Sequence, residues 1–381
     1  MEELDPLLSE PGSPAVMTLF PWDCRVIISL HGLWLPPQSG LLRRFWFHFS
    51  FWGVSFGTVA FLAVDSALSW GPSVMMVLAY LSWLACMFRT RQYLTSDLLK
   101  TATVEDVLIG AGKEEAAFLV RLHLRRFILI DSLVAVIIIV ALGFAVSQPN
   151  SLQIFRWSLH SGAGMQETIL ASVSLACLWW FILGACVCNG TCLAVSDCFR
   201  RVIRRYRQTL AARCEDSSFV ASEDLEELLQ VYRRWHSLMQ ANCVLFSPVL
   251  LFGIITVSLT IGYLVFLLIE AYHQRIAVSW QGIVVLALCV LALLSNLLLP
   301  AMVSAEHSQV ALVAATQRLG HAARDGEGDR RGRRLLSAFV GWCQVAPGWT
   351  VFGTQLTHDV AKGYLVALAT ICTFAASKIV H

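Results

Sequence analysis

Seven stretches of this sequence are each apolar enough and close to long enough to form a helix that crosses a membrane. In chain order they are Phe45 to Leu68, Ser73 to Phe88, Phe127 to Ser147, Thr168 to Cys188, Cys243 to Ile269, Gly282 to Val303 and Val360 to His381. A hydrocarbon core of about 30 Å requires about 20 apolar residues in a helix. In lipid, every backbone polar group must be bonded within the chain, and a helix meets that requirement by itself. We therefore predict an all-α, seven-transmembrane helical bundle embedded in a lipid bilayer.

The composition excludes a soluble domain. Hydrophobic residues make up 57% of the chain and charged residues only 14%, whereas a typical soluble domain has about 25% charged residues. The first residues, MEELDPLLSEP, are acidic and lack the basic region of a removable secretory signal. We expect the first span to act as a signal anchor.

The distribution of basic residues predicts the orientation of the bundle. Of the 28 lysines and arginines, 24 lie in the segments on one side of the predicted spans and two lie in the loops on the other side. Basic residues are retained on the cytosolic side of membrane proteins, so we predict a cytosolic N-terminus and, after seven spans, an extracellular C-terminus. This orientation argues against a G-protein-coupled receptor, whose N-terminus is outside.

The predicted cytosolic segments contain amphipathic helices. Apolar residues recur at helical spacing in 199–210 and again after Ser222, with arginines or acidic residues on the other face. We interpret them as continuations of the fourth and fifth spans below the membrane, and we interpret ARDGEGDRRGRR, residues 323–334, as a solvated insert. The predicted organisation is a cytosolic segment 1–44 with a short pre-membrane helix, spans and helical extensions over 45–334, a short cytosolic anchor helix over 335–355, and the seventh span over 356–381.

The C-terminal region resembles the insect gustatory and odorant receptor superfamily, including its gustatory-receptor-like proteins. The family has a Thr-Tyr pair, five further residues and then Gln-Phe in its last span. Here Thr373 and Phe374 match the pair, AASKI follows, and Val380 and His381 replace Gln-Phe. The stretch HGLWLPP, residues 31–37, is similar to a Gly-aromatic-Pro stretch that precedes the first span in odorant receptors.

The resemblance implies a tetrameric ligand-gated cation channel, formed with identical or related subunits, in which the seventh span lines a central pore. The expected pore-lining residues are Thr373, Ser377, Val380 and His381, which are three or four residues apart and so share one helix face. Close helix packing through the same small residues is the alternative interpretation of this spacing.

The resemblance also implies a small-molecule site in the outer half of the bundle, between the second and sixth spans. The expected ligand-binding residues are polar or aromatic side chains within or near spans: Asp65, Ser172, Ser174, Thr260, Tyr263 and Trp280. A Tyr or Trp near a membrane interface can also serve as an aromatic anchor, whereas an acid such as Asp65 in a span typically faces the bundle interior.

We therefore predict a gustatory receptor-like chemoreceptor channel, gated by a small molecule, in the plasma membrane. The alternative is a transporter or scaffold with the same fold. An acidic dileucine pattern over residues 3–8 adds an endolysosomal membrane as an alternative location. No catalytic motif is present, so no enzyme activity, cofactor, metal site or nucleic-acid partner is expected.

Overall fold

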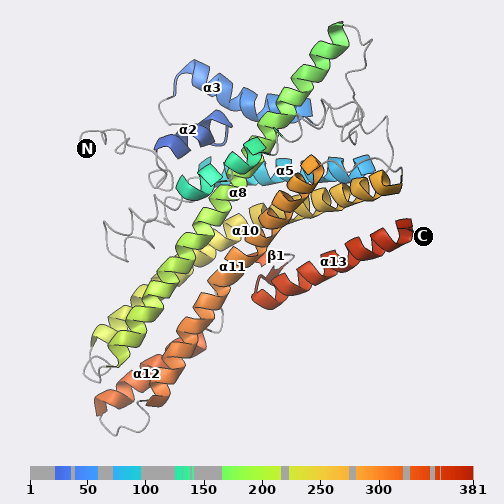
Figure 1. Cartoon of the computed structure of the whole chain (residues 1–381). Coiled ribbons are helices and arrows are strands. Elements are labelled where there is room, and N and C mark those ends of the chain that lie inside the picture. Colours follow the sequence, from blue (N-terminus) through green and yellow to red (C-terminus); the bar gives the residue numbers. More distant parts are fainter. Residues whose placement is uncertain are drawn as a thin grey trace.

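The computed structural model describes residues 22–35, 39–58, 72–95, 125–130, 132–137, 140, 165–215, 223–273, 280–320, 327–343, 348–351 and 353–380. The helices are α2 (Trp22–Leu30), α3 (Leu41–His48), the π-helical turn η1 (Phe49–Gly53), α5 (Pro72–Thr95), α8 (Met165–Cys214), α10 (Glu223–His273), α11 (Trp280–Gly320), α12 (Glu327–Trp342) and α13 (His358–Val380). A short antiparallel hairpin joins β1 (Thr350–Val351) to β2 (Thr354–Gln355). Figure 1 shows α8, α10 and α11 as the long axis of the chain, with α12 at one end and α13 alongside. The predicted all-α class is confirmed.

Three helical stretches in the described part of the chain are long and apolar enough to cross a membrane: Ile182–Cys214, Phe246–His273 and Gly282–Gly320. They overlap the predicted fourth, fifth and sixth spans. The predicted second span lies within α5 and the predicted seventh span coincides with α13 except for His381, which is outside the described residues. The helix that contains the start of the predicted first span begins as α3 at Leu41, ahead of the predicted Phe45, and the described residues of this span end at residue 58. The chain is a multi-pass membrane protein, and its orientation in the bilayer stays a prediction.

The predicted continuation of the fourth and fifth spans as helices is confirmed, because α8 and α10 run through these segments without a break. Beyond the apolar part of each helix, one face stays buried: on α8 it consists of Phe199, Val202, Ile203, Tyr206 and Leu210. Tyr206 packs on Tyr232 of α10, with ring centroids 4.5 Å apart. We call the region formed by α8 from Ser196, α10 up to Ala241, α11 from Ser304 and the whole of α12 the stalk.

The position of α12 corrects the predicted anchor helix. This helix begins at Glu327 and ends at Trp342, instead of covering 335–355, so most of the segment interpreted as a solvated insert is helical. Gly332, Leu336, Phe339 and Cys343 form a continuous buried stripe on it, and Arg331 forms an ion pair with Glu226 of α10 at 3.0 Å. Arg330, Arg331 and Arg334 are exposed and therefore cover the outer face of a packed helix.

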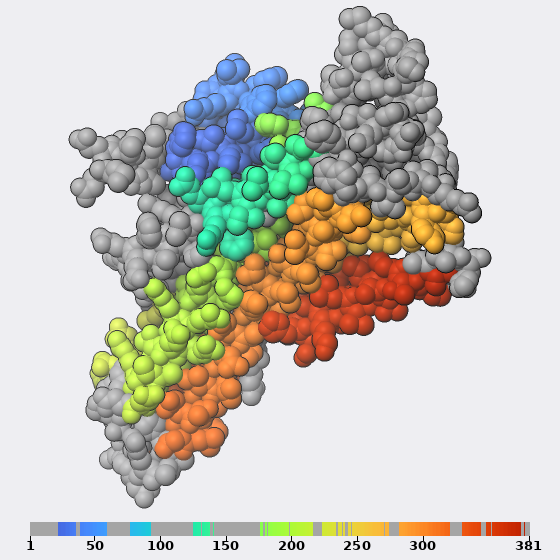
Figure 2. All heavy atoms as spheres, viewed as in Figure 1, coloured from blue at the N-terminus to red at the C-terminus, as the bar shows by residue number. Residues whose placement is uncertain are grey.

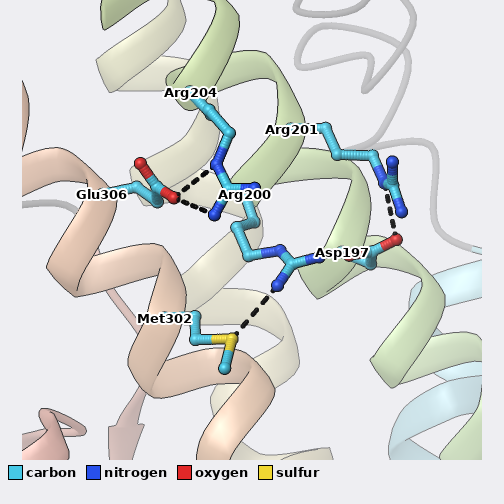
Figure 3. Close-up of polar contacts among 6 residues, drawn as sticks. All are labelled: Asp197, Arg200, Arg201, Arg204, Met302 and Glu306. Atoms are coloured by element: carbon cyan, nitrogen blue, oxygen red, sulfur yellow. Dashed lines mark hydrogen bonds and ion pairs between the residues drawn. The ribbon is translucent and has the colours of Figure 1, made fainter.

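Ion pairs fix α8 to α11 within the stalk (Figure 3). Asp197 is 2% exposed and accepts a hydrogen bond of 2.7 Å from Arg200 on the same helix. Arg200 also reaches across to the Met302 sulfur on α11, at 3.1 Å. Arg204 and Arg207 of α8 form ion pairs across to Glu306 of α11, at 2.6 and 3.2 Å, and Figure 3 shows the pair with Arg204. These buried acids each have a basic partner, as a charge in a dry environment requires.

The described part of the HGLWLPP stretch, residues 31–35, begins with a tight turn at the end of α2. Gly32 has a φ of 67°, a left-handed conformation that glycine adopts without steric cost. A Cβ at this position would lie 2.5 Å from the Ser50 hydroxyl oxygen, so the turn is pressed against η1. The neighbouring His31 stacks on Trp180 of α8 with ring centroids 4.5 Å apart. The turn thus attaches the N-terminal helices to the bundle.

Candidate functional site

A cavity of about 110 Å³ lies inside the bundle, lined by residues of α5, α8, α10 and α11 and by Val134 of the helical stretch 132–137. Its wall is mostly apolar and includes the aromatic rings of Tyr80 and Trp83 from α5. Two of the residues predicted to bind a ligand, Thr260 and Tyr263, come from α10 and line it. The side chain of Tyr263 is buried and that of Thr260 is half-buried.

The polar groups of the cavity differ in whether they already have a partner. Thr260 donates its hydroxyl hydrogen to the carbonyl of Thr256, one turn back in α10, at 2.8 Å. Cys86 makes a weak hydrogen bond of 3.6 Å to the carbonyl of Val249. Asn296 of α11 is 2% exposed, and its amide Nδ2 has no hydrogen-bond partner in the described part of the chain. A buried amide donor without a partner is uncommon and energetically costly.

The other predicted ligand residues cannot be placed at this cavity. Asp65 lies outside the described residues, and Ser172, Ser174 and Trp280 lie on helices whose side chains are not described at these positions. In the described residues, no three His, Cys, Asp or Glu side chains are grouped in a way that would bind a metal ion.

The second candidate feature is α13, which packs against the bundle along one side only. Ala361 is fully buried, and Tyr364, Leu365, Leu368 and Cys372 continue the same face as half-buried residues. The Tyr364 hydroxyl lies 2.9 Å from the hydroxyl of Ser258 on α10. Figure 2 shows the remainder of α13 at the surface of the molecule, beside α11 and α10.

The opposite face of α13 is exposed and carries small hydroxyl groups. Its members are Val366, Thr370, Thr373 and Ser377, spaced by three or four residues so that they share one side of the helix. Each hydroxyl donates to a carbonyl of its own helix, as in Thr373 to Ala369 at 2.9 Å. The hydroxyl oxygens therefore keep lone pairs directed outward. The predicted residues Thr373 and Ser377 lie on this face.

Thr370 belongs to the same exposed face but was not predicted from the sequence. The two other predicted pore residues are not described as side chains there: Val380 is the last residue of α13, and His381 is outside the described residues.

The β1–β2 hairpin connects α13 to the helices of the cavity. On one side, Ser247 of α10 accepts hydrogen bonds from the Thr350 backbone N–H at 3.0 Å and from its hydroxyl at 3.1 Å. On the other side, Ser304 of α11 donates to the carbonyl of Leu356 at 3.1 Å. Between them, the Trp349 ring is fully buried. The hairpin thus contacts both α10 and α11 immediately before α13 begins.

The whole chain resembles solved insect olfactory receptors. The structure of the olfactory receptor OR5 from Machilis hrabei covers 94% of this chain, and 96% of that receptor is covered in turn, with a TM-score of 0.67 and 11% sequence identity. The same receptor in complex with eugenol gives a TM-score of 0.64 over the same shares, again with 11% identity. This chain has the insect olfactory receptor fold. No family model matches the sequence, and no curated protein matches it significantly.

The predicted resemblance to insect-type chemoreceptors is therefore confirmed at the level of the fold. In this fold, α13 is the last helix of the chain. The cavity lies among helices that precede it in the sequence. Sequence reasoning found Thr260 and Tyr263 because they are polar groups inside an apolar span. It missed Asn296, although a lone amide in the segment LLSNLLLP was visible by the same criterion.

Proposed function

We propose that this protein is a subunit of a chemoreceptor-type cation channel that opens when a small neutral molecule binds in the cavity. The observation that carries the proposal is the exposed hydroxyl face of α13, opposite the face by which this helix is attached. A helix that turns Val366, Thr370, Thr373 and Ser377 away from its own bundle presents a weakly polar face, for which another protein surface or water is a better neighbour than lipid. Copies of the same helix around a water-filled axis supply both.

The chemistry of this face suits the passage of cations. Hydroxyl oxygens present lone pairs to the axis, and no charged residue interrupts the face from Val366 to Ser377. A narrow, weakly polar wall of this kind passes ions without binding them tightly, and its apolar positions can act as a gate by losing water. Lys378 follows at the end of the helix, and we expect its long side chain to extend toward the headgroups.

A closed ring of subunits would place this face of α13 around one central axis. We propose a tetramer, formed by this chain alone or with related subunits, as the resemblance to gustatory receptor-like proteins implies. The plasma membrane is the proposed location, with an endolysosomal membrane as the alternative. One of the solved receptors of this fold is bound to eugenol, which supports a small organic molecule as the ligand of this chain.

Cysteine accessibility on α13 tests the channel proposal. The native Cys372 is first replaced by alanine, since it lies on the packed face of the same helix. Single cysteines then replace the exposed residues Thr370, Thr373 and Ser377, and matched control cysteines replace the packed residues Leu365 and Leu368. A membrane-impermeant thiol reagent is applied to cells while the current is recorded with a panel of small neutral ketones and alcohols.

We expect the exposed positions to react and the current to change on reaction, while the packed positions stay unmodified. A period of three to four residues in reactivity is the signature of a helix beside water. Uniform lack of reaction, together with no current under any compound of the panel, would refute the channel and favour the scaffold or transporter.

A further inference from the structure

The cavity contains one buried hydrogen-bond donor that the fold itself leaves without a partner. Asn296 is 2% exposed and lines the cavity, and its Nδ2 has no acceptor within the described residues. We propose that Asn296 selects the ligand, and that the ligand class is small, neutral molecules with a hydrogen-bond acceptor, such as ketones, aldehydes and short esters. This inference rests on the proposed function, because it names the chemistry of the same site.

No charged side chain lines the cavity among the residues that the structure describes, and this disfavours ions as ligands. Its lining residues in the described part of the chain are apolar, aromatic, hydroxyl, thiol or amide side chains, with no Asp, Glu, Lys, Arg or His among them. Moving an ammonium or a carboxylate into such a site without a counter-charge is strongly unfavourable. Amines and acids would therefore have to bind in their neutral forms.

Two of the other polar groups of the cavity are less suited to recognise an acceptor. Thr260 has already donated its hydrogen to Thr256, and the thiol of Cys86 is directed at the Val249 carbonyl. A ligand that offered only donors would leave the Asn296 N–H without a partner, at the same cost as in the empty cavity. A carbonyl oxygen placed against Asn296 removes that cost.

The volume of the cavity limits the size of the ligand. An apolar protein cavity of about 150 Å³ binds benzene, and this cavity measures about 110 Å³. We therefore expect molecules of about four to six non-hydrogen atoms to fit without rearrangement of the helices. Butanone and 2-methyl-1-butene are suitable probes because they have nearly the same shape, with a carbonyl oxygen in the first replaced by a CH₂ group in the second.

The test compares the affinities of these two probes for the full-length protein in detergent, measured by ligand-observed NMR. The variant Asn296→Leu keeps the approximate side-chain volume and removes the donor. The matched control is Ser295→Ala, which removes a neighbouring hydroxyl that donates to Leu291 within α11 and does not line the cavity. The ratio of the affinities for the two probes is compared between the variants and the wild type. Differences in probe solubility are the same for every variant and therefore cancel.

We expect the preference for butanone over 2-methyl-1-butene to fall about 3- to 10-fold in Asn296→Leu, the effect of one neutral hydrogen bond, and to stay unchanged in Ser295→Ala. Asn296→Leu is expected to fold, since it removes an unpartnered polar group from the interior. Asn296→Val gives a second reading if the first variant is not recovered.

The outcomes separate this inference from the proposed function. If neither probe binds the wild-type protein, the cavity is not a ligand site and both proposals fail. If both probes bind but Asn296→Leu keeps the wild-type preference, the ligand site stands and the role of Asn296 is refuted. An ordered water as the sole partner of Asn296 would give that second result.

Discussion

Acidification is expected to destabilise the stalk through His307 of α11. This side chain is fully buried, and its Nδ1 contacts the hydroxyl of Tyr232 on α10. The ring of His236 lies 5.4 Å away between centroids. Burial, and next the proximity of His236, lower the pKa of His307 to about 4 from its ordinary value of 6.5, although a hydrogen bond with the Cys343 backbone acts in the opposite direction.

Among the described residues, the side chains of α10 that contact His307 are Tyr232 and His236, and neither is an acid. Arg233, also on α10, lies over the Trp342 ring, with its guanidinium 5.8 Å from the ring centre. The adjacent Glu306 is already engaged by arginines of α8. Protonation of His307 would therefore place a second cationic group in a buried aromatic cluster.

The sign and size of the effect follow from the lowered pKa. Above about pH 6.5 the imidazole is neutral in the folded and unfolded chains, and the free energy of unfolding does not depend on it. Between about pH 6.5 and 4 the unfolded chain binds a proton that the folded chain does not, so stability falls as the pH falls. At about 1.4 kcal/mol per pH unit, the loss between pH 7.5 and pH 5 is about 2 kcal/mol.

The assay is unfolding of the protein in mixed micelles with increasing SDS, followed by tryptophan fluorescence at about pH 7.5 and about pH 5. His307→Asn keeps an acceptor near Tyr232 but does not titrate, so it should lose about 2 kcal/mol less than the wild type on acidification. His273→Asn, at an exposed position at the end of α10, is the control and should behave as the wild type does. Equal losses in the wild type and His307→Asn would refute the reasoning.

Three further substitutions test the packing of the fold in the same unfolding assay. Gly32→Ala should destabilise the protein by about 2 kcal/mol or more, because alanine is disfavoured at positive φ and its Cβ would collide with Ser50; a neutral effect would show that the turn is not held against η1. Trp349→Ala should cost about 3 to 5 kcal/mol, since it empties the space of a fully buried ring, and a loss below about 1 kcal/mol would contradict that burial. Glu306→Gln should lower the free energy of unfolding by about 1 to 2 kcal/mol, which is less than the loss of a fully buried ion pair, because the Arg204 side chain is 49% exposed. If the ion pair is the cause, high salt should reduce the difference between the variant and the wild type.

The long helices were predictable because their signal is local. Apolar residues at positions 199, 202, 203, 206 and 210 recur with the period of a helix, and the structure buries all of them. The start of α12 was not predictable in this way. The segment GDRRGRR carries four arginines and two glycines, a composition that favours solvent exposure, and its helical form depends on contacts with α10 and α11 that are distant in sequence.

The cavity was predictable only in part, for a related reason. A polar residue inside an apolar span, such as Thr260 or Asn296, is visible in the sequence because it is out of place there. Aromatic residues such as Tyr80 and Trp83 are ordinary in a span, and only the packing of four helices shows that they face one enclosed space. The fold also determines whether a polar group of the cavity already has a hydrogen-bond partner. The groups that have none set which ligands we expect the cavity to bind.

The β1–β2 hairpin, between α12 and α13, would connect the proposed ligand site to the proposed pore helix. Ser247 accepts the hydrogen bonds of Thr350 and is two residues from Val249, which lines the cavity. Ser304 holds the start of α13 through the Leu356 carbonyl, on the helix that carries Asn296. A ligand that changes the separation of α10 and α11 must therefore either displace the hairpin or break these bonds. A ligand shifts an equilibrium only by its differential affinity for two states. The donor that we propose to select the ligand, Asn296, lies on α11, the helix that also holds the start of the proposed pore helix.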